Sequence, residues 1–284
     1  MISRVSLVKS NDHFEGTKSA LENLRPEIEA KVKRSKEVVL KINFVSVLRE
    51  LATTPSEAVD ATIDFLRSFY DGPIKIVETA TMGTTAIGFL RYGFNKLAKK
   101  YQNVQILDLA KDQTVEMDLG GFTVPYSKTM KETDCLISIT RPKTHNSVVA
   151  TLALKNVAVG GIVGARGQIH SGDINKNLLA SAKFRAPDIS ILDGVVGMQG
   201  NGPISGDPID SGWVSVSTDF MAIDTLALFL MGINLDDVGY LTYCAQDGMG
   251  NIYPKDVEVL GEDPASLKKA FKMHPTFGSQ RLWR

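Results

Sequence analysis

Short runs of β-branched residues alternate with helical patterns along most of the chain, and this alternation limits the fold more than any other feature. Strand-like runs occupy residues 5–8, 38–44, 74–78, 104–107, 135–140, 189–192, 213–217 and 257–260. Such alternation is typical of a mostly parallel sheet covered by helices. The sequence therefore predicts an α/β fold with a layered, mostly parallel sheet flanked by helices. Its 284 residues suit a single domain over 1–284, or two intimate lobes with a boundary near 130–140.

Helix signals lie between these runs. The sequence Thr54-Pro55-Ser56-Glu57 offers an N-cap, a proline at the first helical position and a capping-box glutamate, so a helix is expected to begin at Thr54. Apolar residues at helical spacing predict further helices over residues 85–100, 220–231 and 236–246.

Composition excludes several classes of protein. Lys and Arg total 32 and so do Asp and Glu, so no overall positive field favours nucleic acid. The two cysteines, Cys135 and Cys244, are too few for an iron–sulfur cluster and indicate a reducing cytoplasm. The most apolar stretches, 148–165 and 220–233, contain charged residues and fall short of a membrane span, and the amino terminus lacks a signal sequence. We therefore expect a cytoplasmic protein with no membrane segment.

Polar residues gather where the predicted strands end, which is where ligands bind in open α/β sheets. Lys41 and Asn43 share one side of the 38–44 run, where they form either a salt bridge to a helix or an anion-binding pair. The run at 135–140 leads into Arg141-Pro142-Lys143-Thr144-His145, in which Lys143 and His145 could converge on one phosphate or carboxylate. The strand ending at Glu78 is followed by a helix start at 79–85, whose free backbone donors suit an anion.

A second group of polar residues interrupts apolar sequence. Lys155 and Asn156 lie inside the apolar stretch 148–165, and a buried ammonium needs an anionic partner, either a protein carboxylate or a ligand. Arg166 and His170 follow in a glycine-rich segment and add donors. His170 is alternatively a metal ligand, in a divalent-metal set drawn from separate segments: His145, His170, Asp193 and Asp219.

Two aspartates belong to the 213–231 region. Asp219 is most simply an N-cap, and otherwise a carboxylate that faces a ligand. Asp224 lies on the buried stripe of its helix, so it is either half of a structural ion pair or a catalytic acid, with a lysine nearby. The lysines considered as its partner are Lys41, Lys143 and Lys155.

The glycine-rich segment 194–208 is not a dinucleotide-binding motif, because Pro203 and a strand, rather than a helix, follow Gly200-Asn201-Gly202. No Rossmann dinucleotide site is therefore expected. We interpret the segment as a functional or structural loop, and the sequence leaves open whether it is a lid.

Several of these segments, taken together and in order, resemble the domain of unknown function 362 family over about residues 38–261. They are Lys41-Ile42-Asn43, Arg141-Pro142-Lys143-Thr144-His145, Leu154-Lys155-Asn156, Asp193-Gly194, Gly200-Asn201-Gly202-Pro203 and Ser217-Thr218-Asp219-Phe220-Met221-Ala222-Ile223-Asp224. The resemblance implies an uncharacterised bacterial or archaeal α/β domain, often joined to a ferredoxin-like module with cysteine-ligated clusters. With two cysteines, this chain resembles the stand-alone form.

The leading functional hypothesis is an enzyme or enzyme-like domain that binds a small anionic metabolite or cofactor at the carboxyl edge of the sheet. Its ligand-binding residues are Lys41, Asn43, Lys143, Lys155, Asn156 and Arg166, and its candidate catalytic residues are His145, His170 and Asp224. The alternatives are a non-catalytic or redox-associated partner of a separate ferredoxin or enzyme, and a buried ion network that only stabilises the fold. A homo-oligomer is compatible with each.

Overall fold

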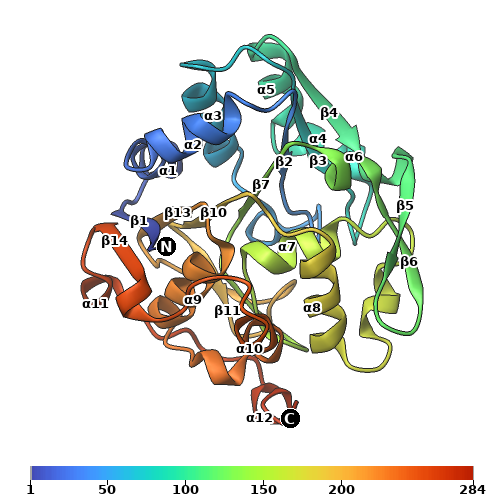
Figure 1. The fold of residues 1–284 in the computed structure, drawn as a ribbon, viewed down its shortest axis with the longest axis vertical. Helices are drawn as coiled ribbons and strands as arrows, with labels where there is room; N and C mark the ends of the chain where they lie inside the picture. The colour runs from blue at the N-terminus through green and yellow to red at the C-terminus, as the bar shows by residue number, and fades with distance from the viewer. Residues whose placement is uncertain (1, 284) are drawn as a thin grey trace.

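The computed structural model describes residues 2–283, and a single eight-stranded sheet runs through its middle (Figure 1). The strand order is β14 (Val257–Gly261), β1 (Ser3–Lys9), β13 (Trp213–Ser217), β10 (Ile189–Gly194), β7 (Cys135–Thr140), β2 (Val38–Lys41), β3 (Ile74–Glu78) and β4 (Val104–Asp108). β13 is antiparallel to its neighbours β1 and β10, and the other neighbouring pairs are parallel. Each of the eight predicted strands lies in this sheet, which confirms the α/β fold.

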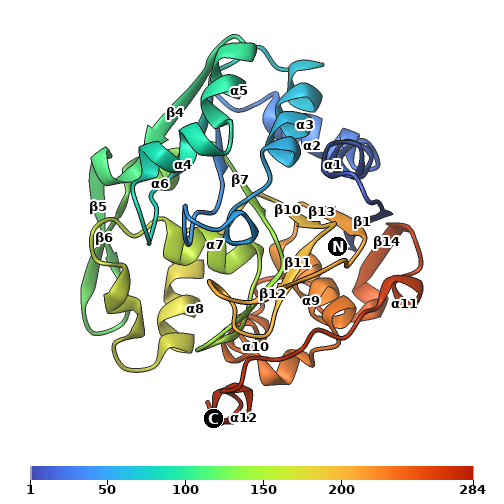
Figure 2. The same cartoon turned by 180° about the vertical axis from the view of Figure 1, so that it is seen from behind.

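Helices cover both faces of the sheet, so the molecule has three layers (Figures 1 and 2). One face carries α1 (His13–Glu22), α2 (Arg25–Val32), α3 (Ser56–Arg67), α4 (Thr85–Arg91) and α5 (Phe94–Lys100). The other carries α7 (Ala153–Gly160), α8 (Ile174–Phe184), α9 (Phe220–Met231) and α10 (Gly239–Gln246). Alternation along a strand fills both cores: Val38 and Leu40 belong to the first core and Val39 to the second.

Shorter elements complete the chain. A second, four-stranded sheet has the order β12 (Asp207–Ile209), β11 (Gly197–Gln199), β8 (Lys143–His145) and β9 (Val149–Thr151). A separate hairpin joins β5 (Thr114–Asp118) to β6 (Thr123–Ser127). The short helices are α6 (Lys128–Glu132), α11 (Pro264–Leu267), α12 (Phe277–Gln280), η1 (Glu50–Ala52), η2 (Leu109–Lys111), η3 (Arg166–His170), η4 (Leu235–Asp237) and η5 (Pro254–Asp256). The glycine-rich segment predicted as a loop thus contains β11 and part of β12.

Three predicted helices differ from those observed. The helix expected over 85–100 is divided into α4 and α5 at Gly93, whose φ of 82° does not continue a helix. The helix expected over 236–246 begins only at Gly239, after η4. Thr54 is not an N-cap, because its hydroxyl accepts a hydrogen bond from the Asn43 amide and donates one to the Ile139 carbonyl. Its bonds instead tie the ends of two strands together.

β2 ends three residues earlier than predicted, and the chain then changes direction in a way that matters for the site. The Asn43 backbone turns to the Thr54 hydroxyl instead of continuing the ladder, and Phe44 forms an isolated bridge with Thr53. The Asn43 side chain thereby reaches the carboxyl edge of the sheet.

Within residues 2–283, the longest apolar helical segments fall short of the length and hydropathy needed to cross a bilayer.

Candidate functional site

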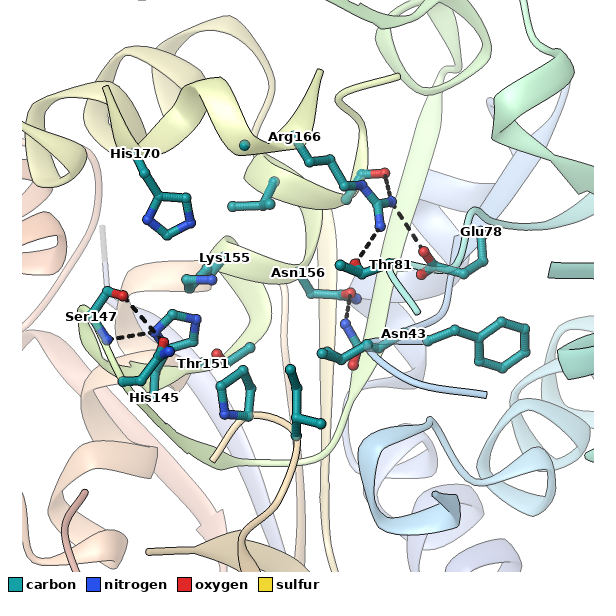
Figure 3. Close-up of a pocket in the computed structure, with 18 of the residues that line it drawn as sticks. Asn43, Glu78, Thr81, His145, Ser147, Thr151, Lys155, Asn156, Arg166 and His170 are labelled. Atoms are coloured by element: carbon teal, nitrogen blue, oxygen red, sulfur yellow. Dashed lines mark hydrogen bonds and ion pairs between the residues drawn. The ribbon is translucent and has the colours of Figure 1, made fainter. Parts of the chain in front are cut away.

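A cavity of about 280 Å³ lies at the carboxyl edge of the sheet, beyond the ends of β2 and β3 and beside α7 (Figure 3). Residues from the second sheet and η3 close its other sides. Its polar lining consists of Lys41, Asn43, Glu78, Thr81, His145, Asn146, Ser147, Thr151, Lys155, Asn156, Arg166 and His170.

Most of the residues that the sequence nominated meet here, although they come from four separate segments. Those that line the cavity are Lys41, Asn43, His145, Lys155, Asn156, Arg166 and His170. Lys143 lies behind the lining, and its ammonium donates a hydrogen bond of 2.5 Å to Asn43 Oδ1. The shared location is now observed, whereas the roles of these residues remain predictions.

One wall of the cavity is an ion-pair network around Glu78. The Lys41 ammonium contacts Glu78 Oε2, and the Arg166 guanidinium lies 3.1 Å from Oε1. Burial lowers the pKa of the Lys41 amine to about 8, although the Glu78 charge acts in the opposite direction. The carboxylate is also bound by the Thr79 amide, at 2.8 Å, so both of its oxygens are occupied.

Glu78 is the site residue whose pairing the sequence reasoning missed. The sequence pattern marks it only as the residue before an anion-binding turn. The pairing could have been found from the sequence, because Glu78 is the last residue of a strand that lies beside the strand carrying Lys41. Parallel neighbouring strands bring their carboxyl ends to the same edge of the sheet.

The first part of the turn after Glu78 does not offer the free backbone donors that were expected. The amide of Ala80 donates to the Thr85 hydroxyl, and those of Thr81 and Met82 donate to carbonyls of the segment after β2. These hydrogen bonds attach the turn to its neighbours, so Thr81 contributes a side chain to the cavity rather than an anion-binding backbone.

Two asparagines connect the ion-pair wall to the floor of the cavity. Asn156 donates from Nδ2 to the Lys41 carbonyl and to the Ser138 hydroxyl, both at 3.1 Å, and accepts at Oδ1 from Asn43 Nδ2. Because Lys143 donates to Asn43 Oδ1, the amide orientation of Asn43 is fixed and one of its Nδ2 hydrogens has no protein partner among the described residues. Asn43 is half-buried and presents this donor at the lining.

Among the lysine and arginine side chains that line the cavity, Lys155 is the one without a partner in the described part of the chain. It lies in the first turn of α7, is 7% exposed, and makes no hydrogen bond or ion pair with any described residue. Burial lowers the pKa of its amine to about 8, and the Arg166 charge acts in the same direction. No carboxylate of residues 2–283 offsets these effects.

Two histidines lie on either side of Lys155 in Figure 3. His145 is buried and accepts at Nδ1 from the Ser147 amide at 3.0 Å, so its neutral ring carries the proton on Nε2. Burial and then the Lys155 charge place the pKa of His145 well below its usual range. His170 is exposed, and partial burial together with Lys155 lowers its pKa less.

The carboxyl-terminal segment holds the turn that carries His145. The Gln280 side chain donates to the His145 carbonyl at 3.0 Å and accepts from the Val149 amide. Val149 has a φ of 67°, a left-handed conformation that is rare for a β-branched residue. This outlier is therefore stabilised by a hydrogen bond from outside its own hairpin.

Asp224 does not lie at the cavity, and it pairs with none of the lysines considered for it. It is completely buried and accepts from the amides of Ala153 and Leu154, at 2.9 and 3.0 Å. Burial raises the pKa of Asp224 to about 7, although the two amides act in the opposite direction. The prediction of a lysine partner is wrong because the free amides at the start of α7 satisfy this carboxylate instead.

The expected metal ligands are not brought together. Asp219 caps α9 through the amides of Met221 and Ala222, and Asp193 binds His13 Nδ1 at 2.7 Å. Neither aspartate lines the cavity with His145 and His170. Among the described residues, no three His, Cys, Asp or Glu side chains cluster closely enough to hold a metal ion.

Fold and cavity together define a three-layer α/β protein with a donor-rich pocket at the carboxyl edge of its sheet. Its family follows from a match to the family model described as Domain of unknown function (DUF362), which covers residues 38–229. The chain belongs to this family. The match leaves α10 to α12 outside the family segment.

Individual relatives give less information. A thylakoid-associated protein of a Synechocystis strain is 34% identical over 130 residues, which is 44% of this chain and 40% of the relative. The chain therefore matches less than half the length of that protein. The lactate racemase apoprotein of Thermoanaerobacterium thermosaccharolyticum has a TM-score of 0.53 and 15% identity over 82% of this chain and 57% of its own, a likeness of fold. A crystal structure of a Thermotoga maritima protein is more distant, at a TM-score of 0.37 and 11% identity over 71% of this chain and 55% of its own.

Proposed function

We propose that the protein binds a small anionic metabolite or cofactor in this cavity, as an enzyme or enzyme-like domain in which His145 donates a hydrogen bond to the reacting group and His170 moves protons. The observation that carries the proposal is Lys155, a residue that is only 7% exposed and whose ammonium has no counter-charge in the described part of the chain. A buried cation without a partner costs several kcal/mol, so a site that retains one gains by taking up an anion.

The charges of the lining support this proposal. Lys41, Arg166 and Lys155 bring three positive charges, and Glu78 brings one negative charge. Glu78 is already shared by Lys41 and Arg166. The cavity lining therefore has an excess of positive charge, which a ligand with one or two negative charges would neutralise.

The hydrogen-bonding groups support it as well. Unused donors in the lining include the Lys155 ammonium, one Asn43 N–H and the Nε2–H of His145. Both oxygens of Glu78 are occupied, so the wall of the cavity that contains Glu78 offers few hydrogen-bond acceptors to a ligand. An oxyanion, which only accepts hydrogen bonds, is the complementary ligand.

As the setting for this function we propose a reducing cytoplasm, because Cys135 and Cys244 are both buried and free.

Titration calorimetry with acetate, malonate and inorganic phosphate tests the proposal directly. We expect at least one to bind, and Lys155→Met to weaken that binding about tenfold or more, since a charge-assisted hydrogen bond contributes about 1.5–3 kcal/mol. The matched control is Lys96→Met, which removes an exposed helical lysine and should leave the affinity unchanged.

Native mass spectrometry of the untreated protein complements the titrations, because it can detect a retained anion that the three test compounds do not represent. The proposal would be abandoned if no anion were retained and none bound more tightly than about 10 mM. Equal affinities in Lys155→Met and Lys96→Met would also overturn it.

A further inference from the structure

We propose that Lys155 forms a Schiff base with the carbonyl carbon of a small 2-oxo acid bound in the cavity. The inference rests on the proposed function and makes it more specific, because it names the ligand class and a covalent step. It follows from the position of an unpaired amine between two imidazoles, with oxyanion donors elsewhere in the same cavity.

The amine of Lys155 is free to react in a way that the other buried amines are not. The three hydrogens of the Lys41 ammonium are directed to the Ile42 carbonyl, Glu78 and Asn156. Lys143 donates to Asn43 and does not line the cavity. Lys155 lines the cavity and has no partner among the described residues, so its nitrogen is available to a bound ligand.

The surroundings of Lys155 enlarge the fraction of its amine that is neutral, which is the nucleophilic form. The cations Arg166 and Lys143 lie nearby, and no carboxylate among the described residues faces Lys155. At about pH 7.5, an amine whose pKa is about 8 is neutral roughly two hundredfold more often than an exposed lysine. Desolvation beside another cation is a known way to activate a lysine toward carbonyl compounds.

The carboxylate of a 2-oxo acid would find its partners at the other wall. Asn43 has one unused Nδ2 hydrogen, and Arg166 Nη1 donates to the Thr81 hydroxyl with one of its two hydrogens. A cavity of about 280 Å³ is at the small end of ligand pockets, which favours an acid of a few carbons. A 2-oxo acid unites a carboxylate with a carbonyl carbon that an amine attacks.

The step balances without an oxidant or a reductant. The nitrogen lone pair of Lys155 forms the C–N bond, the carbonyl π electrons move to oxygen, and one proton passes from nitrogen to that oxygen. The lone pair left on nitrogen then forms the C=N bond while the C–O bond breaks, and the hydroxyl leaves as water with a second proton taken from solvent, so that the product is a protonated imine. The Nε2–H of His145 can donate to the carbonyl oxygen, and the exposed His170 can exchange protons with solvent.

The test is reductive trapping of the intact protein with sodium cyanoborohydride and, in separate reactions, pyruvate, glyoxylate and oxaloacetate. Peptide mapping by mass spectrometry then locates the reduced adduct. We expect one adduct on Lys155, formed at least about tenfold faster than on the exposed Lys96, as the difference in neutral fraction requires.

Two variants separate charge from covalency. Lys155→Arg retains a cation but cannot form a Schiff base, so we expect it to bind pyruvate in calorimetry and to show no adduct at position 155. Lys96→Arg should be trapped at Lys155 at the wild-type rate.

The inference is overturned if these acids bind but leave Lys155 unmodified, or if Lys155 reacts no faster than Lys96. Binding of inorganic phosphate without binding of any of the three acids overturns the inference and leaves the proposed function standing. Failure of every anion to bind overturns both.

Discussion

Replacement of Lys155 by methionine is expected to stabilise the unliganded protein, although it removes a residue of the proposed site. Burial lowers the pKa of this amine from 10.5 to about 8. At 1.36 kcal/mol per pKa unit, holding the charged form in the folded state costs about 3 kcal/mol. Methionine fills a similar unbranched volume without a charge, so up to about 3 kcal/mol is recovered at neutral pH.

The gain should depend on pH in a defined direction. Below about pH 8, Lys155 is protonated in both the folded and the unfolded chain, and the wild-type protein bears the whole penalty. Between about pH 8 and 10.5 the folded protein releases this proton while the unfolded chain retains it, so the wild type becomes relatively more stable as pH rises. The advantage of Lys155→Met should therefore be largest at neutral pH and shrink above pH 8. Lys41 titrates in both proteins and cancels in the difference, whereas loss of the Lys155 charge also raises the pKa of Lys143 and of His145.

Urea unfolding of both proteins at about pH 7 and about pH 10 measures this difference, with Lys96→Met as the control. Addition of a bound oxyanion at neutral pH should narrow or reverse the gap, because only the wild type has the ammonium that the anion neutralises. A Lys155→Met protein that is less stable than the wild type at neutral pH would refute the reasoning, since it would show that the ammonium is already compensated. A gain that does not change with pH would refute it as well.

Three further substitutions address the surroundings of the site. Glu78→Gln should lower stability by about 3–5 kcal/mol by leaving two cations without their carboxylate, and a larger rise in melting temperature on adding phosphate than in the wild type should accompany it. Gln280→Ala removes the hydrogen-bond partner of two backbone groups in the His145 turn, so the free energy of unfolding should fall by about 1–3 kcal/mol and calorimetry should show weaker anion binding. Unchanged values of both would exclude a positioning role for Gln280. Asp224→Asn should lower stability by about 1–3 kcal/mol while anion affinity stays within about twofold, and the opposite result would restore a role in the site.

The middle of the sheet could be predicted from the sequence because β2, β7, β10 and β13 are buried on both faces and read as short, largely apolar or β-branched runs. β7 and β13 begin and end where the pattern places them. The second sheet could not be predicted, because β8, β9, β11 and β12 are three residues long and its pairing depends on tertiary contacts. The division between α4 and α5 depends on the backbone conformation of Gly93, which a helical period does not reveal.

The location of the site was predictable for a similar reason, because parallel strands bring their carboxyl ends to one edge of the sheet. That rule groups Lys41 with His145 although they are distant in the sequence. It does not determine which opposite charges meet. The sequence favoured Asp224 as the partner of a lysine, whereas Glu78 has that role and Asp224 binds backbone amides. Pairing depends on distances of a few ångströms, and these are set by packing of the helices.

The placement of Asp224 also explains why Lys155 remains uncompensated. The amino-terminal end of a helix carries a partial positive charge, so a lysine in the first turn of α7 is in an unfavourable position. Asp224 accepts from the first two amides of that helix, but both of its oxygens are occupied there and none reaches the ammonium. Burial also weakens its charge, because it raises the pKa of Asp224 to about 7. The carboxylate therefore secures the helix without neutralising the lysine, and a ligand at the cavity is what remains to supply the missing negative charge.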